Sequence, residues 1–302
     1  MFPLIFIVGP TATGKSDIAF VIAKRINAEI VSCDSMLIYR EPSIITAKPP
    51  KCILEEVKHH FVNIVSVKDT YNVFTYFTDA TKVINDCITR NVPVVICGGT
   101  GLYFSILLDG IFMDRCYEPS LRELLLKDVM SRGKEYLYQK LREVDPISAQ
   151  KISPNDIKRI IRALEVYYLE GIPIWEKQKQ RKGLWNNYPM VIFGLTMQRK
   201  HLYQRINRRV DKMFEEGAVE EVKEILKIPL SITAKKIIGI EEIRGVLEGK
   251  YSVDFAKMLM SKRTCHFAKR QFTWFKRDKR IRWIDVEDMS IEAISKEILE
   301  EV

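Results

Sequence analysis

The chain has 302 residues, of which 47% are hydrophobic and 29% charged, and its formal net charge is +9. These values are typical of a globular protein with one large domain, or a domain carrying an insertion. Because no apolar run approaches the ~20 residues of a membrane-spanning helix, and no basic leader precedes the first apolar run, we expect neither a membrane span nor a signal peptide. The basic balance suits a polyanionic partner, although charge alone could also serve solubility.

Cysteine usage points to a reducing compartment. The six cysteines are scattered without a C-x-x-C pair, which favours free cytoplasmic thiols and argues against a zinc site. They are Cys33, Cys52, Cys87, Cys97, Cys116 and Cys265.

The first predicted strand, residues 4–8, leads directly into the spacing G-x-x-x-x-G-K-S and a helix predicted at 17–25. This spacing between a strand and a helix is typical of a phosphate-binding loop, whose glycines let backbone N–H groups face phosphate oxygens. Lys15 would neutralise a terminal phosphate, and the Ser16 hydroxyl suits Mg²⁺. The loop consists of Gly9, Pro10, Thr11, Ala12, Thr13, Gly14, Lys15 and Ser16.

Further strands are predicted at 29–33 and 92–97, with helical spacing of apolar residues between them. Strands alternating with helices predict an α/β fold: a P-loop-like parallel sheet with helices on both faces. Asp34 follows the second strand and the glycine-rich turn 98–103 follows the third, so both should face the phosphate loop. Asp34 would act there as a general base or a Mg²⁺ ligand; the alternative is a helix cap or turn carboxylate.

From 113 to 188 the pattern is helical, with helices predicted at 120–132, 135–143 and 155–170. Asn155 is the expected N-cap of the last of these, and Gly171 its stop. The chain then returns to a strand at 190–196, helices at 200–216, 218–227 and 253–277, and a short strand at 282–285. We therefore predict a core formed by 1–112 and 189–302, interrupted by a helical insertion at 113–188.

His59 and His60 fall in a region predicted to be a loop, together with Lys48. Paired histidines can bind a metal, but no third ligand lies nearby in the sequence. We expect one ring to pack and the other to cap, without a metal.

Two helical faces are basic. Arg159 and Arg162 share one face with Lys158 nearby. The alternative to RNA binding is a solvated helix face with a contact from Arg162 to Glu165. On the last long helix aromatic residues interleave with a basic stripe, an arrangement that suits unstacked bases and phosphates of RNA. That stripe consists of Lys262, His266, Lys269, Arg270 and Arg277.

These motifs, in this order, resemble the tRNA dimethylallyltransferase family over nearly the full chain. The matching segments are residues 9–16, 34–36, 46–49, 59–60, 98–103, 154–156, 159, 162–165, 209–211, 213, 268–271 and 273–275. The resemblance implies transfer of a dimethylallyl group from dimethylallyl diphosphate to N6 of the adenosine just 3′ of a tRNA anticodon (position 37), with Mg²⁺ as cofactor. It also implies a cytoplasmic enzyme; nothing suggests an obligate partner protein, and we expect a monomer.

The resemblance assigns roles to particular residues. Asp34 is expected to be the base, a role that typically supplies ~10²–10⁴-fold, with Thr100 beside it. Arg205 and Arg209 are expected to reach the diphosphate together with the phosphate loop. The flipped base would be held by Asp34, Ser35, Met36 and Leu37, and the tRNA contacted by Thr100, Arg122, Lys158, Arg159, Arg162, Lys269 and Arg270.

The sequence departs from the family pattern where the acceptor is read. Leu37 stands where Gln is usual, Ile45 ends a segment that usually reads Asp-x-Gly, and Ile240 replaces an aromatic residue. Three alternatives remain open: a divergent paralogue with an altered or lost RNA acceptor, prenyl transfer to free adenine nucleotides, and a P-loop kinase or NTPase that uses ATP.

Overall fold

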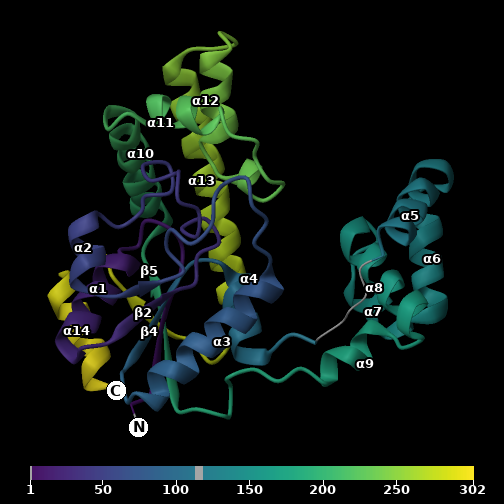
Figure 1. Cartoon of the computed structure of the whole chain (residues 1–302), viewed down its shortest axis with the longest axis horizontal. Coiled ribbons are helices and arrows are strands. Elements are labelled where there is room, and N and C mark those ends of the chain that lie inside the picture. The colour runs from purple at the N-terminus through teal and green to yellow at the C-terminus, as the bar shows by residue number, and fades with distance from the viewer. Residues whose placement is uncertain (1, 113–117) are drawn as a thin grey trace. The chain divides into compact units, whose positions relative to one another are not determined.

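The computed structural model describes residues 2–112 and 118–302, and it divides into two compact units (Figure 1). The larger unit contains 1–108 and 184–302, and the smaller contains 109–183. The sequence predicts the insertion at 113–188. In the structure it begins and ends a few residues earlier, at 109 and 183. Cys116 lies outside the described residues.

In the described part of the larger unit, six strands form one parallel sheet in the order β3-β2-β4-β1-β5-β6. The predicted parallel α/β sheet is confirmed. The strands are β1 Leu4–Val8, β2 Glu29–Ser32, β3 His59–His60, β4 Val94–Gly98, β5 Met190–Thr196 and β6 Arg282–Asp285. His59 and His60 were predicted in a loop; they pair with Ile30 and Val31 as an edge strand too short for a periodicity to reveal.

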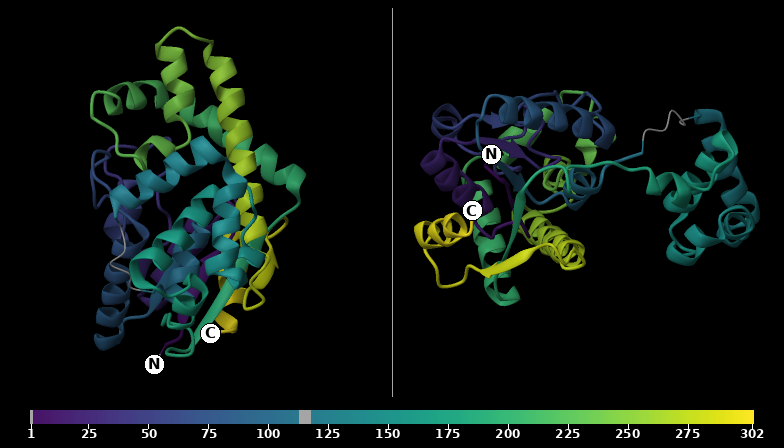
Figure 2. Two further views of the ribbon diagram at one scale, coloured as in Figure 1. Left: turned by 90° about the vertical axis from the view of Figure 1, so that its right-hand side faces the viewer. Right: turned by 90° about the horizontal axis from the view of Figure 1, so that it is seen from below.

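Both faces of the sheet are covered by helices because successive strand residues point to opposite sides and those of the central strands β1, β4 and β5 are nearly all apolar. Helices α1 and α14 lie on one side of the sheet, and α3 and α4 lie on the other (Figures 1 and 2). Ile5 and Ile7 pack on the side of α1 and α14, whereas Phe6 meets Phe104 of α4 edge to face at 6.0 Å between ring centroids. Helix α3 lies on that second side too, where the hydroxyl of Tyr76 donates to the backbone oxygen of Ser32 at 2.9 Å. The helices near the sheet are α1 Lys15–Ile26, α2 Lys51–Glu56, α3 Val73–Thr89, α4 Gly101–Asp109 and α14 Ile291–Glu300.

Two long helices extend the larger unit beyond the sheet. Helices α10 and α13 run side by side, with α11 and α12 at their far end (Figure 1). The ranges of these elements are α10 Arg199–Glu215, α11 Ala218–Ile225, the 3₁₀ turn η1 Ala234–Lys236, α12 Ile240–Leu247 and α13 Val253–Phe275. None of the helices that the structure describes is long and apolar enough to cross a membrane.

All the secondary-structure elements among the described residues of the smaller unit are helices, and the unit has its own apolar core, to which Leu141 and Leu164 contribute. Helix α8 ends at Gly171 as predicted, but its N-cap is Asp156 and not Asn155, because the Asp156 carboxylate accepts from the backbone N–H of Arg159 at 3.2 Å. Its helices are α5 Pro119–Arg132, α6 Lys134–Val144, α7 Pro146–Lys151, α8 Ile157–Glu170 and α9 Ile174–Lys179.

Candidate active site

The phosphate loop lies at the carboxyl end of β1 and is shaped by two glycines. Gly9 has φ +139°, and a Cβ there would lie 2.6 Å from the backbone oxygen of Leu195 on the neighbouring strand β5. Gly14 has φ +87° and forms the N-cap of α1. A side chain at either position would be strained, so the loop can follow this path only with glycine there. Residues 11, 12 and 14–16 of the loop line the cavity described below, next to the N-terminus of α1.

Lys15 is buried and folds back onto its own loop. Its Nζ donates to the backbone oxygen of Pro10 at 2.5 Å, and the Thr13 hydroxyl donates to the same oxygen at 2.9 Å. Burial lowers the pKa of Lys15 to about 8, although the charges of Cys97 and Asp34 oppose this shift. A phosphate in the loop would stabilise the ammonium form, so anion binding and the protonation of Lys15 are linked.

Gln271 on α13 joins the phosphate loop to the glycine-rich turn. Its Oε1 accepts from the backbone N–H of Thr11, and its Nε2 donates to the backbone oxygen of Gly99, both at 2.8 Å. A Cβ on Gly99 would collide with the Gln271 amide, which explains the glycine. No sequence pattern predicts this role of Gln271, whose only signal in the sequence is its place in the matching segment 268–271.

Asp34 and Thr100 are brought together at the ends of β2 and β4. An Asp34 oxygen accepts from the backbone N–H of Met36 at 2.8 Å. The Thr100 hydroxyl accepts from the backbone N–H of Ser35 at 3.0 Å and lies 3.2 Å from the Ser35 hydroxyl. The carboxylate therefore belongs to a turn held by hydrogen bonds at both ends, and it is partly exposed.

Two cavities meet at this turn. The first, of about 440 Å³, is lined by the phosphate loop with Lys48, Arg205 and Leu37. The second, of about 420 Å³, is lined by Ser35, by basic side chains that include Lys236, Arg263 and Arg270, and by apolar side chains from α10, α13 and the chain near α12. Four residues line both cavities: Thr11, Asp34, Thr46 and Arg209. Asp34 thus stands between a polar, cationic chamber and a more apolar one.

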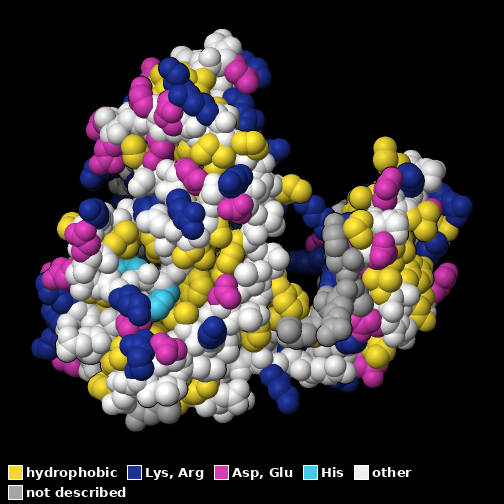
Figure 3. Space-filling model, viewed as in Figure 1, with side chains coloured by type: hydrophobic (Ala, Val, Ile, Leu, Met, Phe, Trp, Pro, Cys, Tyr) yellow, Lys and Arg dark blue, Asp and Glu magenta, His cyan; other side chains and the backbone are white. Residues whose placement is uncertain are grey.

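Cations surround the polar chamber. Arg209 Nη1 donates to the Thr11 hydroxyl at 3.2 Å, and burial lowers the Arg209 pKa while Asp34 and Asp17 oppose the shift. Arg205, one helical turn earlier, is exposed and lines the same chamber. On the face drawn in Figure 3, Lys and Arg side chains alternate with hydrophobic ones over the larger unit. The electrostatic environment favours an anionic ligand.

Of the remaining residues of the larger unit that are predicted to contact tRNA, some line a cavity and one does not. Met36 and Arg270 line the more apolar cavity, with the Arg270 guanidinium 5.8 Å from the Phe267 ring centroid. Lys269 is exposed on α13 and lines neither cavity among the described residues. Of the departures from the family pattern, Ile45 lines the more apolar cavity, whereas Ile240 is fully buried at the start of α12.

Predicted RNA contacts in the smaller unit form an ionic cluster. Glu165 is completely buried; Arg122 Nε lies 3.1 Å from one of its oxygens and Arg162 Nη1 lies 3.5 Å from the other. The predicted i,i+3 contact is present, but a buried carboxylate makes it more than a feature of a solvated face. Arg159 pairs with Asp156 at 3.0 Å and is exposed, as is Lys158.

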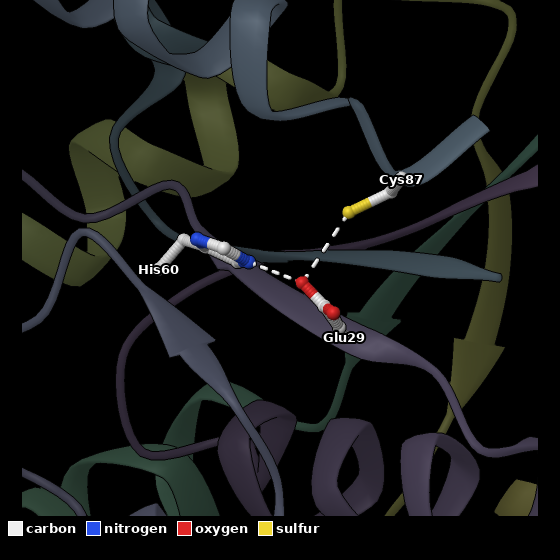
Figure 4. A group of neighbouring side chains, drawn as sticks. All are labelled: Glu29, His60 and Cys87. Carbon is white, nitrogen blue, oxygen red and sulfur yellow. Dashed lines mark hydrogen bonds and ion pairs between the residues drawn. The ribbon is translucent and has the colours of Figure 1, made fainter. Parts of the chain in front are cut away.

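Glu29, His60 and Cys87 converge in space although they are distant in the sequence (Figure 4). No third ligand lies near His59 and His60 in the sequence, but the fold brings Glu29 and Cys87 to His60, because ligand positions on three different elements cannot be read from spacing. The Glu29 carboxylate also lies 2.9 Å from Arg90 and 3.2 Å from Lys58. Burial alone would raise the Glu29 pKa, but hydrogen bonds from Arg90, His60 and Lys58 outweigh it and lower that pKa to about 2. A metal cation would have to displace two positive charges, so the arrangement favours a structural ionic cluster.

A phosphate-binding loop on the first strand of a parallel α/β sheet, with a carboxylate and a glycine turn on the adjacent strand ends, defines a P-loop-type protein. The family model described as IPP transferase matches residues 37–278. The chain belongs to this family.

Individual relatives agree with this assignment. The tRNA dimethylallyltransferase of Carboxydothermus hydrogenoformans is 44% identical over 303 residues, covering 99% of this chain and 96% of the relative. A crystal structure of a full-length tRNA isopentenylpyrophosphate transferase from Bacillus halodurans has a TM-score of 0.72 and 34% identity, covering 99% of this chain and 94% of the other. A eukaryotic dimethylallyltransferase studied acting on tRNA has a TM-score of 0.81 at 27% identity, covering 95% and 75%.

The pKa of Lys15 predicts how diphosphate binding depends on pH. Below about pH 8 Lys15 is already protonated in the free protein, so affinity should be level; above it, binding must take up a proton and affinity should fall, by up to about tenfold per pH unit. Titration calorimetry with inorganic diphosphate between about pH 7 and pH 9.5 measures this.

Lys15→Arg is the matched control because arginine stays charged throughout. The titration of the ligand and of Lys48, whose pKa is also about 8, is common to both proteins. The difference between them therefore reports Lys15. Parallel pH curves for wild type and variant would contradict the assignment.

Proposed function

We propose that this protein transfers a dimethylallyl group from dimethylallyl diphosphate to N6 of the adenosine 3′ of the anticodon in tRNA, releasing diphosphate. The main observation behind this proposal is that Asp34 lies where two cavities meet, one polar and cationic and the other more apolar. Curated relatives covering nearly the whole chain are tRNA dimethylallyltransferases, which supports the same activity here.

The polar chamber suits the diphosphate of the donor. Loop amides, the N-terminus of α1, Lys15 and Arg209 can neutralise the charge that grows as the diphosphate leaves. The apolar side chains of the neighbouring cavity, such as Ile206 and Val210, offer the prenyl chain and the adenine ring a place shielded from water.

The chemistry is a substitution at C1 of the prenyl group. The N6 lone pair forms the new C–N bond as the C1–O bond breaks, and the electron pair leaves with the diphosphate. The amine must also lose a proton, and Asp34 is the carboxylate placed to accept it at the junction. The hydrogen bond from the Met36 amide fixes the orientation of that carboxylate.

The residues present fit a Mg²⁺ ion accompanying the donor. The Ser16 hydroxyl and the carboxylates of Asp17 and Asp34 line the polar chamber, and hard oxygen donors of this kind suit Mg²⁺. The ion would supply positive charge that neutralises the diphosphate oxygens.

The acceptor is proposed to be the anticodon stem-loop of tRNA, with the smaller unit contributing phosphate contacts from Lys158 and Arg159. The protein is proposed to act as a cytoplasmic monomer. Two basic helical surfaces argue against a free adenine nucleotide as the acceptor, since so small an acceptor needs neither of them. The curated relatives, which are tRNA dimethylallyltransferases, argue against a kinase.

One experiment separates the candidate functions. Wild-type protein is incubated with labelled dimethylallyl diphosphate, Mg²⁺ and either an anticodon stem-loop containing consecutive adenosines or AMP. Label in the RNA supports the proposal. Label in AMP supports the nucleotide-prenylating alternative, and binding of the stem-loop without transfer supports a paralogue that has lost catalysis.

Replacing Asp34 with Asn should lower kcat by about 10²–10⁴-fold, because the amide cannot accept the N6 proton. The Asn side-chain oxygen can still accept from the Met36 amide, so the turn is preserved. Affinity for the stem-loop, measured by fluorescence anisotropy, should stay within about threefold. Equal losses of binding and turnover would contradict a role as base.

Arg159→Ala should weaken stem-loop binding and reduce the slope of log affinity against log salt concentration by about one, as loss of one phosphate contact does. Arg142→Ala, an exposed arginine on α6 of the same unit, is the matched control. An unchanged slope for the Arg159 variant would mean that this helix face is solvated and makes no phosphate contact.

A further inference from the structure

Residues 43–48, called the strap below, cross the region where cavities meet. Thr46 lines both substrate cavities, and Ile45 lines the more apolar one. A third cavity of about 400 Å³ is lined in part by Ser43, Ile44, Ala47 and Lys48. Because open space borders the strap along much of its length, close packing alone does not fix its position.

The strap is a short turn, in which Ala47 has a left-handed backbone conformation with φ +49°. The backbone N–H of Ala47 donates to Ile44 at 2.9 Å, and that of Lys48 donates to Ser43 at 3.0 Å. The first N–H groups of such a turn have no acceptor within the turn itself. They need an acceptor from elsewhere, and an anion is the most favourable one.

Glu221 of α11 supplies that anion. Its Oε1 accepts from the amides of Ser43 at 2.6 Å and Ile44 at 2.7 Å, and its Oε2 accepts from the amide of Ile45 at 3.0 Å. Three backbone donors on one carboxylate form a charge-assisted cluster, which is stronger and more directional than neutral hydrogen bonds.

We propose that Glu221 is a positioning residue of the active site, whose carboxylate holds the strap against the diphosphate chamber so that the donor binds tightly. This inference rests on the proposed function for the identity of the donor. Glu221 does not itself line either substrate cavity among the described residues, so it acts through the strap. The strap carries Thr46, Ala47 and Lys48 to the chamber wall.

The distal end of the strap is held independently. Lys48 Nζ donates to the backbone oxygens of Tyr39 at 2.9 Å and Arg40 at 3.0 Å. Burial lowers the Lys48 pKa to about 8, and the charges of Glu221 and Glu41 act in the opposite direction. Glu221 therefore fixes the first amides of the strap and also favours the charged form of the lysine at its end.

The test compares Glu221→Ala with Glu220→Ala, which removes an exposed carboxylate from the same turn of α11. We expect Glu221→Ala to raise the KM for dimethylallyl diphosphate about tenfold with kcat within about threefold, in line with the loss of charge-assisted hydrogen bonds. Calorimetry with inorganic diphosphate should show the same loss without any turnover. Glu220→Ala should match wild type, and stem-loop affinity should be unchanged in both.

Hydrogen exchange tests the contact itself. In Glu221→Ala the amides of Ser43, Ile44 and Ile45 should exchange at least about tenfold faster, with the amides of β1 unaffected. Glu221→Gln, which keeps an acceptor oxygen but loses the charge, should show an intermediate KM. If Glu221→Ala lowers the unfolding midpoint, the KM of Glu221→Gln decides whether the effect comes from the lost contact or from a weakened fold.

The inference is overturned if Glu221→Ala binds diphosphate as wild type does, if only kcat falls, or if β1 exchanges faster to the same extent as the strap. A wild-type protein that binds diphosphate but transfers no prenyl group would instead contradict the proposed function. The diphosphate calorimetry would still decide the role of Glu221 in that case, so the two failures are distinguishable.

Discussion

The parallel pairing of β4 between β2 and β1 is the constraint on which the site depends. It places the carboxyl ends of three strands side by side, and Asp34, the glycine turn and the phosphate loop each follow one of them. The approach is close: a Cβ on Gly98 would collide with the backbone of Cys33, while the amide of Thr100 donates to the Cys33 oxygen at 3.1 Å. Any larger residue at Gly98 would separate the two strand ends, and with them Asp34 and the phosphate loop.

Holding cations in the chamber carries a free-energy cost that a ligand can offset. Lys15 and Arg209 are both desolvated enough for their pKa values to fall. Each is hydrogen-bonded to the phosphate loop, Lys15 to Pro10 and Arg209 to Thr11, so the chamber partly satisfies them from within. A diphosphate would replace these weak acceptors with strong ones, and this exchange would favour a highly charged anion as the ligand.

Local patterns predict the central part of this structure well. Apolar runs predict the ranges of β1 and β5, the range of the short strand β6 is also predicted, and a glycine stop predicts the end of α8 at Gly171. The sequence also places Asp34 and the phosphate loop at the same edge of the sheet, where the strands end. What local patterns miss depends on distant partners. The pairing of His59 and His60 with β2 requires a neighbour 29 residues away for each residue, and the N-cap of α8 is chosen between two adjacent polar residues by side-chain geometry.

The partners of carboxylates that accept from several distant donors are the clearest example of contacts that sequence periodicity does not predict. Glu165 and Glu221 occupy helices, and Glu29 begins a strand, positions where an acid is ordinarily a solvated residue. In the folded chain Glu165 is buried between two arginines, and Glu221 binds three amides of the strap. The same residue type thus neutralises arginines in one unit and orders backbone in the other, and only the surrounding donors distinguish these roles. Because removing an acid leaves those donors without their acceptor, the cost depends on whether water can reach them. The amide of Ser43 is exposed and those of Ile44 and Ile45 are partly buried, while Arg122 and Arg162 are themselves partly exposed, so water can reach some of the donors in both places.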